Sequence, residues 1–473
     1  MHLRRRPCLL VCLALAAASC GVAGSGGGSD GPKATTTVPA GPSGAKAVLA
    51  KLRGSVAFVE TPTGTGSGVF VDGGYLVTNS HVVDPFDVAD VAFDGDEPIE
   101  DVPVVGVDLD ADAAVLGPIE GSHPTTTIED PKGIEQGSTL YLVGYPGDQE
   151  EPEITITSGL LSRRRPAKEW GYEFLQSDAK IAPGQSGGAL ADEAGRVVGI
   201  SGLADDDGYA LTASGADAAA AVRAILDGKG SKGWEPAPHA GDRKDASFHV
   251  EGTSDYRLLY FPATDDDVTV AIGVDGPAPV VELDDAGLYP LALNQAALDL
   301  GSITGGGPEG EDLPDATAPG ADGKLTFTLE AGYPSVLFVG TAKDEPATLE
   351  VTSSVAFAVV NGDPEPRAIE PSSKVISGDL GYFDVADEYE LDLAAGDVVH
   401  IRASSATGDV AYTVVAPGET YDTSEEVDGG GGGLFDADAE GDFEADVDGT
   451  YRLDVYQVEG VSTGYHLEVS SAG

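Results

Sequence analysis

The sequence predicts a mainly β protein built from several domains. Its 473 residues are too many for a single hydrophobic core, so about two to four domains are expected. Glycine (65 residues) and proline (30 residues) are abundant, which favours short strands and turns over long helices. Short alternating apolar runs, separated by Gly, Asp, Asn and Pro, follow one another along most of the chain, as is typical of β-sandwiches and β-barrels.

Charge and cysteine content exclude several kinds of site. The formal net charge of −54 excludes a nucleic-acid-binding protein of the usual kind, because such a protein must neutralise phosphates with basic side chains. The three cysteines, Cys8, Cys12 and Cys20, all lie in the first twenty residues. The rest of the chain therefore has no thiol for a disulfide, a zinc cluster or a cysteine nucleophile, and its stability must come from packed cores.

Residues 1–19 have the features of an export signal. A basic start at Arg4–Arg6 precedes the apolar run "CLLVCLALAAA" and the small-residue site "AASC", and the run is too short for a membrane-spanning helix. The segment resembles a bacterial lipoprotein signal, which implies lipidation of Cys20 and anchoring to the cell membrane outside the cytoplasm. Secretion after cleavage nearby is the alternative. Residues 20–45 are rich in Gly, Ser, Thr and Pro and are expected to form a flexible tether.

Residues 46–228 are expected to form one β-rich domain. A short helix is expected at 45–53, and the Ala-rich run "GADAAAAVRAILDG" at 215–228 is expected to close the domain as a second helix. Between them the apolar pattern predicts strands at 55–60, 68–72, 75–79, 102–107, 113–116, 139–145, 153–161, 172–178, 188–192 and 197–203.

The remainder of the chain repeats one pattern twice. After a linker at 229–245, the stretch 254–274 parallels 387–405, and the stretch 325–354 parallels 441–471. Each consists of alternating strands around an acidic turn, which predicts two β-sandwich modules, 246–355 and 366–473. The second module resembles the pre-peptidase C-terminal domain of secreted bacterial proteases, through "DEYELDLAAGDVVHIRA" and "GTYRLDVY". Its acidic loop at 436–449 could hold calcium, but a solvated acidic surface is the expectation.

The stretch "SDAKIAPGQSGGAL" (177–190) contains a serine that is either a nucleophile or part of a glycine-rich hairpin. A nucleophilic serine needs a histidine base and a carboxylate that orients the histidine. Of the histidines beyond the signal, only His81 directly follows a strand pattern, "GYLVTNSHVV". Asp112 directly precedes a short apolar strand, and Asp108 and Asp110 are its local competitors. Surface, turn or linker roles are expected for His123, His239, His249, His400 and His466.

Three segments now resemble the catalytic segments of chymotrypsin-fold serine proteases of the HtrA/Deg type: "GTGSGVFVDGGYLVTNSHVV" (64–83), "DADAAVL" (110–116) and 177–190. The order His, Asp, Ser is that of this fold. The resemblance implies a double β-barrel with His81 as general base, Asp112 as its orienting acid and Ser186 as nucleophile. No cofactor or metal is required.

The resemblance covers about 46–228 and carries further expectations. The glycines around Ser186 allow the backbone N–H groups of Gly184 and Ser186 to face a developing oxyanion. PDZ domains follow the protease in familiar members of the family, whereas β-sandwich patterns stand here. Because the three segments are complete within 46–228, peptide cleavage is expected to survive truncation after Gly230. A catalytically silent binding protein, in which the sandwiches bind a partner, is the alternative function.

The sequence leaves open which substrate residue is preferred directly before the scissile bond. Lys180, six residues before the serine, is expected near the pocket that reads this residue, with Gly199, Ile200 and Ser201 lining it. An inward ammonium of Lys180 would favour Glu or Asp. Because an unpaired buried ammonium is costly and the long stem can reach solvent, an aliphatic pocket that accepts Val, Ala or Leu is expected instead.

Overall fold

The computed structural model describes residues 44–471, apart from a large gap at 286–323 and smaller gaps. The smaller gaps are 148–151, 168–170, 205–208, 232–233, 235, 251–256, 276–278, 330, 333, 342–345, 361–365, 382, 384–385, 406–409, 418–424, 428–438 and 458–461. The predicted signal, Cys20 and nearly all of the tether therefore lie outside the described residues. None of the described helices is long and apolar enough to cross a membrane.

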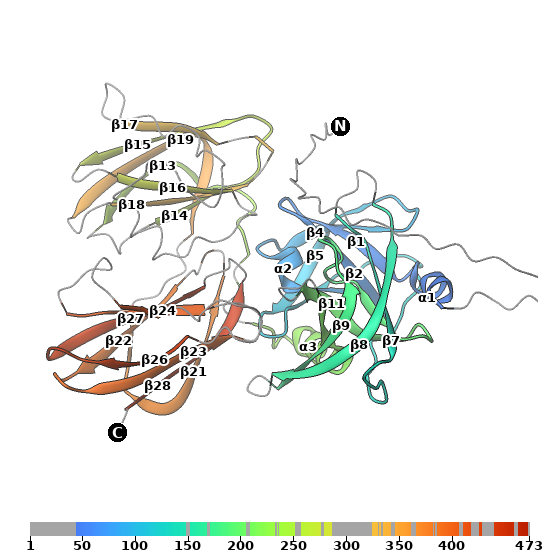
Figure 1. The fold of residues 1–473 in the computed structure, drawn as a ribbon. Coiled ribbons are helices and arrows are strands. Elements are labelled where there is room, and N and C mark those ends of the chain that lie inside the picture. Colours follow the sequence, from blue (N-terminus) through green and yellow to red (C-terminus); the bar gives the residue numbers. More distant parts are fainter. Residues whose placement is uncertain are drawn as a thin grey trace, which may run out of the picture. The chain divides into compact units, whose positions relative to one another are not determined.

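Two closed six-stranded barrels follow each other in the first half of the chain, as the blue and green strands of Figure 1 show. The strand order is β1-β2-β3-β6-β5-β4 in the first barrel and β10-β11-β12-β9-β8-β7 in the second. The chymotrypsin-like double barrel expected from the sequence is thus confirmed. Its strands are β1 Val56–Glu60, β2 Thr65–Val71, β3 Tyr75–Thr78, β4 Val88–Phe93, β5 Ile99–Asp108, β6 Ala113–Leu116, β7 Thr139–Gly144, β8 Thr155–Ala167, β9 Tyr172–Lys180, β10 Ala189–Ala191, β11 Val197–Ala204 and β12 Tyr209–Ser214.

Three helices accompany the barrels. The predicted helices correspond to α1 (Ala45–Leu52) and α3 (Gly215–Leu226), and the short α2 (Ser80–Val83) follows β3. The side chain of Ser214 caps α3 by accepting a hydrogen bond from the backbone N–H of Asp217, which satisfies a donor that the helix itself cannot. The alternation that identifies β4 was present in "VADVAF", whose residues are alternately buried and half-buried, but that strand was not predicted.

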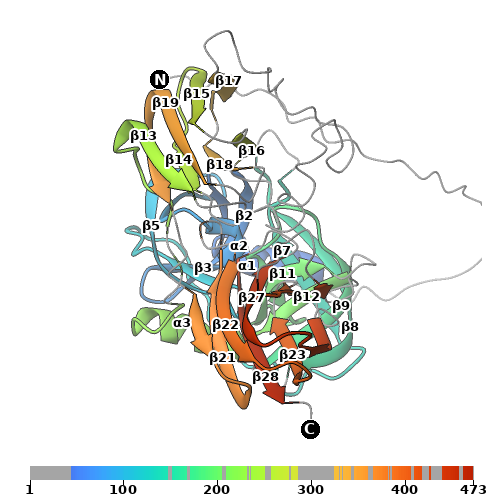
Figure 2. The same ribbon diagram turned by 90° about the vertical axis from the view of Figure 1, so that its left-hand side faces the viewer.

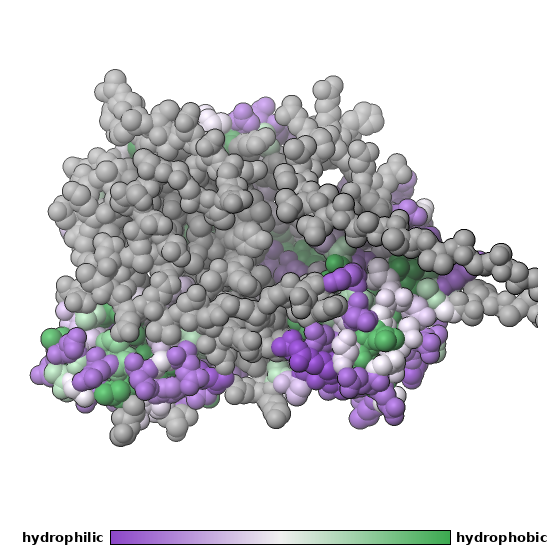
Figure 3. Space-filling view, in the orientation of Figure 1, coloured by the Kyte–Doolittle hydropathy of each residue, from purple (hydrophilic) through white to green (hydrophobic). Residues whose placement is uncertain are grey.

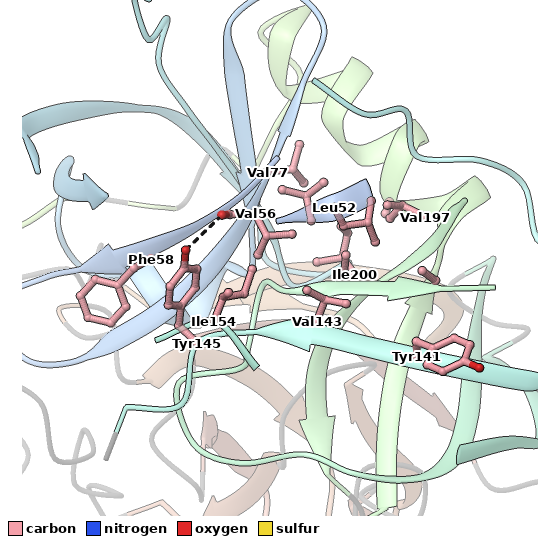
Figure 4. Close-up of a cluster of buried hydrophobic side chains, with 14 of the residues drawn as sticks. Leu52, Val56, Phe58, Val77, Tyr141, Val143, Tyr145, Ile154, Val197 and Ile200 are labelled. Atoms are coloured by element: carbon pink, nitrogen blue, oxygen red, sulfur yellow. Dashed lines mark hydrogen bonds between the residues drawn. The ribbon is translucent and has the colours of Figure 1, made fainter. Parts of the chain in front are cut away.

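A shared apolar core holds the barrels together. Val56 of the first barrel and Val143 and Ile200 of the second lie in one cluster of buried side chains. In the close-up of Figure 4, Tyr145 lies beside Phe58 and its hydroxyl donates to the carbonyl oxygen of Val56 at 3.5 Å. The catalytic candidates lie on segments from both barrels. This core therefore sets the position of His81 and Asp112 relative to Ser186.

The second half of the chain forms two sandwiches of sheets. In the first module β19 joins both sheets, one ordered β13-β19-β15-β17 and the other β16-β18-β14. In the second module the sheets are β21-β28-β23-β26 and β20-β22-β27-β24-β25, visible in orange and red in Figure 2. The strands are β13 Arg243–Val250, β14 Arg257–Phe261, β15 Val268–Asp275, β16 Pro279–Asp285, β17 Lys324–Leu329, β18 Ser335–Thr341, β19 Ala347–Val360, β20 Arg367–Ile369, β21 Ser372–Leu380, β22 Ala386–Leu393, β23 Val398–Ser405, β24 Val410–Val415, β25 Glu425–Val427, β26 Ala439–Glu444, β27 Gly449–Gln457 and β28 Thr463–Ser471.

The two modules share five strand pairs, as expected for two copies of one pattern. The pairs β13·β19, β15·β19 and β15·β17 of the first module correspond to β21·β28, β23·β28 and β23·β26 of the second. Likewise β14·β18 and β16·β18 correspond to β22·β27 and β24·β27. In each module the facing sheets bury one common core, which explains the alternating sequence of their strands.

Candidate functional site

His81 and Asp112 come from the ends of neighbouring strands of the first barrel. Strands β3 and β6 are antiparallel, with Thr78 opposite Ala114. Continuing this register by two residues brings position 80 opposite position 112, so that α2 meets the turn before β6. His81 was expected directly at a strand end. It lies instead one residue into α2, because β3 ends at Thr78 and the extended Asn79 precedes a helical turn.

The imidazole of His81 is paired with the carboxylate of Asp112. Nδ1 of His81 lies 2.9 Å from Oδ2 and 3.0 Å from Oδ1 of Asp112. The side chain of Asp112 is 6% exposed, whereas that of His81 is 25% exposed and so remains open to solvent. Burial by itself lowers the pKa of His81, but the charge and hydrogen bond of Asp112 and the charge of Asp84 outweigh it, and the net pKa is raised above 6.5.

Asp112 is held by its neighbours in an unusual backbone conformation. Its φ of 46° lies in the left-handed region, which is unfavourable for a residue with a side chain. Ser80 Oγ donates to Oδ1 of Asp112 at 2.9 Å, and Asn79 Nδ2 donates to its carbonyl oxygen at 2.8 Å. The backbone N–H of His81 also donates to Oδ1, at 3.2 Å. These bonds fix the carboxylate beneath the imidazole.

The competing carboxylates do not occupy this place. Asp108 Oδ1 accepts a hydrogen bond from the backbone N–H of Ala111 at 3.1 Å and so stabilises the turn before β6. Burial, with smaller contributions from the charges of Asp108 and Asp379, raises the pKa of Asp110 to about 7. Asp112 is therefore the carboxylate of this turn that pairs with His81.

Most of the other histidines have partners away from this pair. His123 stacks on Phe93 with ring centroids 3.9 Å apart, and the ring nitrogens of His400 contact Asp442 and Glu440. His239 contacts Asp87 at 3.0 Å, and His249 on β13 lies 3.4 Å from Thr348. His466 lies on β28, in the second sandwich module.

Ser186 lies in the loop between β9 and β10, where two glycines make close approaches possible. Gly184 and Gly187 have φ of 87° and 82°. A Cβ atom on Gly184 would lie 2.2 Å from the backbone nitrogen of Gly147, and one on Gly187 would lie 1.9 Å from the carbonyl oxygen of Ser67. Both positions therefore require glycine for conformation and for space.

Hydrogen bonds fix the orientation of two peptide planes in this loop. The carbonyl oxygen of Pro183 accepts from Gly147 N–H at 2.9 Å, and that of Gln185 accepts from Gly188 N–H at 3.1 Å. In a trans peptide the N–H points away from the carbonyl. The N–H groups of Gly184 and Ser186 are therefore turned away from these partners, as an oxyanion site on the other side would require.

Three further side chains, not identified from the sequence as functional, hold the same loop. Ser67 Oγ donates to the carbonyl oxygen of Gly184 at 2.8 Å, and Ser67 N–H donates to the carbonyl oxygen of Ser186 at 2.7 Å. Gln185 is buried, with Oε1 accepting from Ala182 N–H and Nε2 donating to Thr155 Oγ1, both at 2.9 Å. Asn79 Oδ1 accepts from Gly187 N–H at 2.6 Å. In the sequence, Asn79 could have been noticed from its place beside His81 in "TNSH", and Gln185 from its place directly before Ser186.

Gly202 lies between the hydroxyl of Ser186 and the carboxylate of Asp112. Ser186 Oγ donates to the carbonyl oxygen of Gly202 at 3.0 Å. A Cβ atom on Gly202 would lie 3.1 Å from Oδ2 of Asp112 and 2.8 Å from Nδ2 of Asn79. The serine, the carboxylate and the turn that carries His81 thus meet around one residue of β11.

The expected pocket residues lie on neighbouring strands. Lys180 is exposed at the end of β9, whereas Ile200 and Ser201 are buried on β11. The backbone of Ser201 bonds to both glycines after Ser186, because its N–H donates to the carbonyl of Gly188 at 2.9 Å and its carbonyl accepts from the N–H of Gly187 at 2.6 Å. An exposed Lys180 agrees with a long stem that reaches solvent, and the pocket assignment stays a prediction.

Comparison with known families agrees with this fold and site. Residues 66–200 match the family model described as trypsin-like peptidase domain. Together with the two closed barrels, this match supports the class of trypsin-like serine peptidases.

Within that class the similar curated proteins are HtrA and Deg proteases. The serine protease Do-like HtrA of Lactobacillus helveticus is 38% identical over 136 residues, 28% of this chain and 32% of the relative. The protein of the same name from Bacillus subtilis (strain 168) is 31% identical over 202 residues, 38% of this chain and 43% of the relative. The periplasmic serine endoprotease DegP of Escherichia coli (strain K12) is 37% identical over 142 residues, 28% of this chain and 29% of the relative.

Among solved structures, the HtrA-type protease AlgW with tripeptide is 28% identical, with a TM-score of 0.36, over 39% of this chain and 64% of that one. The chain thus spans less than half the length of these three curated relatives. The likeness to them supports an HtrA-type serine endopeptidase.

Proposed function

We propose that the protein is a serine endopeptidase, with His81, Asp112 and Ser186 as its catalytic triad. The contact of 2.9 Å between His81 Nδ1 and the buried carboxylate of Asp112 carries the proposal. Such a carboxylate holds the imidazole in the tautomer whose Nε2 can take a proton, and it stabilises the imidazolium that results. Cleavage of peptide bonds follows as the reaction, since the similar proteins are serine proteases.

In the proposed mechanism Ser186 Oγ attacks the carbonyl carbon of the scissile bond while His81 Nε2 takes its proton. The proton then passes from His81 to the leaving amine, and water releases the acyl group from Ser186 in the reverse sequence. The hydroxyl of Ser186 donates to Gly202 in the free protein, so rotation about its Cα–Cβ bond toward His81 belongs to the mechanism. Catalytic hydrogen bonds are often formed only once substrate is bound.

The N–H groups of Gly184 and Ser186 would stabilise the oxyanion of the tetrahedral intermediate. Their peptide planes are held by the bonds of Pro183 and Gln185, so little reorientation accompanies the reaction. Preorganised donors of this kind supply about 2.7–4 kcal/mol of transition-state stabilisation each.

Labelling with a fluorophosphonate probe tests the proposal. The full-length protein should form a covalent adduct at Ser186, and the Ser186→Ala variant should form none. An unlabelled wild-type protein that is folded by circular dichroism would instead favour a catalytically silent binding protein.

We propose that the enzyme acts outside the cytoplasm on proteins or peptides, anchored to the membrane by a lipid on Cys20. The basic start, apolar run and "AASC" of the signal support this, and secretion is the alternative. Partition of the wild-type protein into Triton X-114, and loss of that partition in Cys20→Ala, would support the anchor. An unchanged partition would contradict it.

For the residue before the scissile bond we propose Val, Ala or Leu. The exposed side chain of Lys180 supports an aliphatic pocket formed by Gly199, Ile200 and Ser201. A peptide-library profile should show these residues and should not change in Lys180→Ala. A preference for Glu or Asp that disappears in Lys180→Ala would contradict the proposal.

A further inference from the structure

Ser231, Trp234 and residues 236–239, here called the strap, follow α3, and several of them bond to the first barrel. Ser231 N–H donates to the carbonyl oxygen of Val107 at 2.9 Å, and Ser231 Oγ accepts from Leu109 N–H at 3.0 Å. Farther along, Ala237 N–H donates to the carbonyl oxygen of Pro85 at 2.7 Å. The strap therefore contacts the segment that leads to Asp112 and the segment that follows His81.

The central contact of the strap is between Trp234 and Asp84. Nε1 of Trp234 donates to Oδ1 of Asp84 at 2.6 Å, and its ring packs against the buried apolar cluster of the first barrel. Asp84 is 4% exposed and ends α2, because its backbone N–H donates to the carbonyl oxygen of Ser80 at 2.9 Å. Its Oδ2 accepts a second hydrogen bond, from Ser462 Oγ.

Asp84 is thus a second carboxylate near His81, besides Asp112. Burial lowers the pKa of His81, whereas Asp112 and, to a smaller extent, the charge of Asp84 raise it. Burial outweighs the hydrogen bonds of Ser462 and Trp234 and the charge of His81, and it raises the pKa of Asp84 to about 6. The indole N–H favours the ionised form of this carboxyl group and so opposes the effect of burial.

We propose that Trp234 is a positioning residue of the catalytic centre, which holds Asp84 as a charged group at the end of the helical turn that carries His81. The inference rests on the triad assigned above. The proposal assigns a function to a segment that the sequence presented only as a linker, because the strap would then help to position groups near His81. Trp234 acts through Asp84 and His81 and does not itself contact substrate.

The variant Trp234→Phe tests this, because it keeps an aromatic ring and removes the N–H donor. Without that donor, Asp84 should be protonated at higher pH and His81 should lose part of a nearby negative charge. The midpoint of the His81 titration should then fall by at least about 0.3 pH unit, and Asp84→Asn should shift it in the same direction by more. His239→Gln, which removes the exposed contact of the strap with Asp87, is the matched control and should leave the midpoint unchanged.

The titration is measured by NMR on the full-length protein with ¹³C-labelled histidine, in the Ser186→Ala background, with His81→Ala used for assignment. Because this readout needs no activity, it remains valid even if fluorophosphonate labelling contradicts the proposed reaction. In the active enzyme, the acidic limb of kcat/KM should shift by the same amount as the titration. A lower melting temperature in Trp234→Phe with an unchanged His81 midpoint would show a merely structural role and overturn the proposal.

Discussion

Gln185 connects the loop of Ser186 to β8 through its side chain. One end accepts from Ala182 N–H and the other donates to Thr155 Oγ1, so the buried amide spans the segment that contains Gly184. The backbone of Gln185 also positions Ser186, through the bond between its carbonyl oxygen and Gly188 N–H. The side chain before the serine therefore supports the orientation of the proposed oxyanion donors.

Replacing Gln185 with Leu should lower kcat while changing KM little. The substitution removes both side-chain bonds, and a small displacement of the oxyanion donors weakens an interaction made mainly in the transition state. We expect a loss of about tenfold to a hundredfold in kcat, measured with a peptide substrate. Thr155→Val removes only one of the two bonds and should cause a smaller loss, whereas Thr155→Ser should be close to wild type. An increase in KM alone would contradict this role.

Asp84 should make the folding stability depend on pH in a direction opposite to that of a salt-bridged carboxylate. Its pKa is raised from 3.8 to about 6 in the folded protein, mainly by burial. The folded state therefore binds more protons than the unfolded state between these pH values, and this contribution is fully present below pH 3.8 and is lost as pH rises through 6.

The loss amounts to about 3 kcal/mol, an order-of-magnitude figure from roughly two pKa units. It is measured as the difference in the free energy of unfolding between wild type and Asp84→Asn, by chemical denaturation at about pH 4 and pH 7. Relative to Asp84→Asn, the wild type should have a lower free energy of unfolding at pH 7 than at pH 4. A difference that stays constant with pH would show that Asp84 is not buried in this way.

At the scale of secondary-structure elements, the strap is bonded to the first barrel. The linker was expected at 229–245, and β13 begins at Arg243. Before that strand, Ser231, Trp234 and Ala237 each bond to the first barrel. These residues thus contact the first barrel, although their sequence has no helical or strand periodicity.

We expect a protein truncated after Ala240 to be more stable than one truncated after Gly230. Both keep the three catalytic segments, but only the longer one keeps the strap, with its apolar contact and its hydrogen bonds. Loss of about 1 kcal/mol per hydrogen bond predicts a melting temperature lower by several degrees for the shorter protein. Differential scanning calorimetry of the two proteins compares them directly. Equal melting temperatures would mean that the strap adds nothing to the barrels.

The repeat in the second half is also a property of elements. The sequence predicted the repeat from its alternating strands, and the structure adds corresponding strand pairs such as β14·β18 and β22·β27. In the second module Tyr389, Tyr412 and Tyr451 are buried in the core, so aromatic residues mark the inward face. The duplication was therefore legible before the pairing was known.

At the scale of the whole molecule, the main feature is the formal net charge of −54. In the space-filling view of Figure 3, hydrophilic residues predominate over the described part of the face drawn, with hydrophobic residues scattered among them. Ion pairs such as Arg53–Asp94 and Arg196–Asp192 compensate only part of the charge, because acidic residues outnumber basic ones by 80 to 26. The folded chain therefore repels itself.

Moderate sodium chloride should raise the melting temperature of the full-length protein. Salt shortens the distance over which like charges repel, to about 8 Å at 0.15 M. Differential scanning fluorimetry between low and moderate salt measures the effect. A flat or falling melting temperature would show that repulsion between the acidic residues is not a significant cost of folding.

The sequence by itself predicted a β-rich chain, a repeated pattern in its second half and the order of the three candidate catalytic segments, whereas the double barrel was implied by the family resemblance. These features depend on local patterns: alternation of apolar residues, glycines around Ser186, and an aspartate directly before an apolar strand. The strand patterns singled out His81 and Asp112, and the family resemblance then implied their roles. Even β4, which was missed, carried the alternation that would have identified it.

Only the tertiary structure decided how the side chains meet. Asn79, Ser67 and Gln185 bond to residues far away in the chain, and no sequence period indicates which backbone groups they reach. The contact between Asp84 and Trp234 joins residues 150 positions apart. Folding brings such pairs together because buried polar groups must find partners. Which partner each finds depends on how the barrels pack, and that is a property of the whole chain.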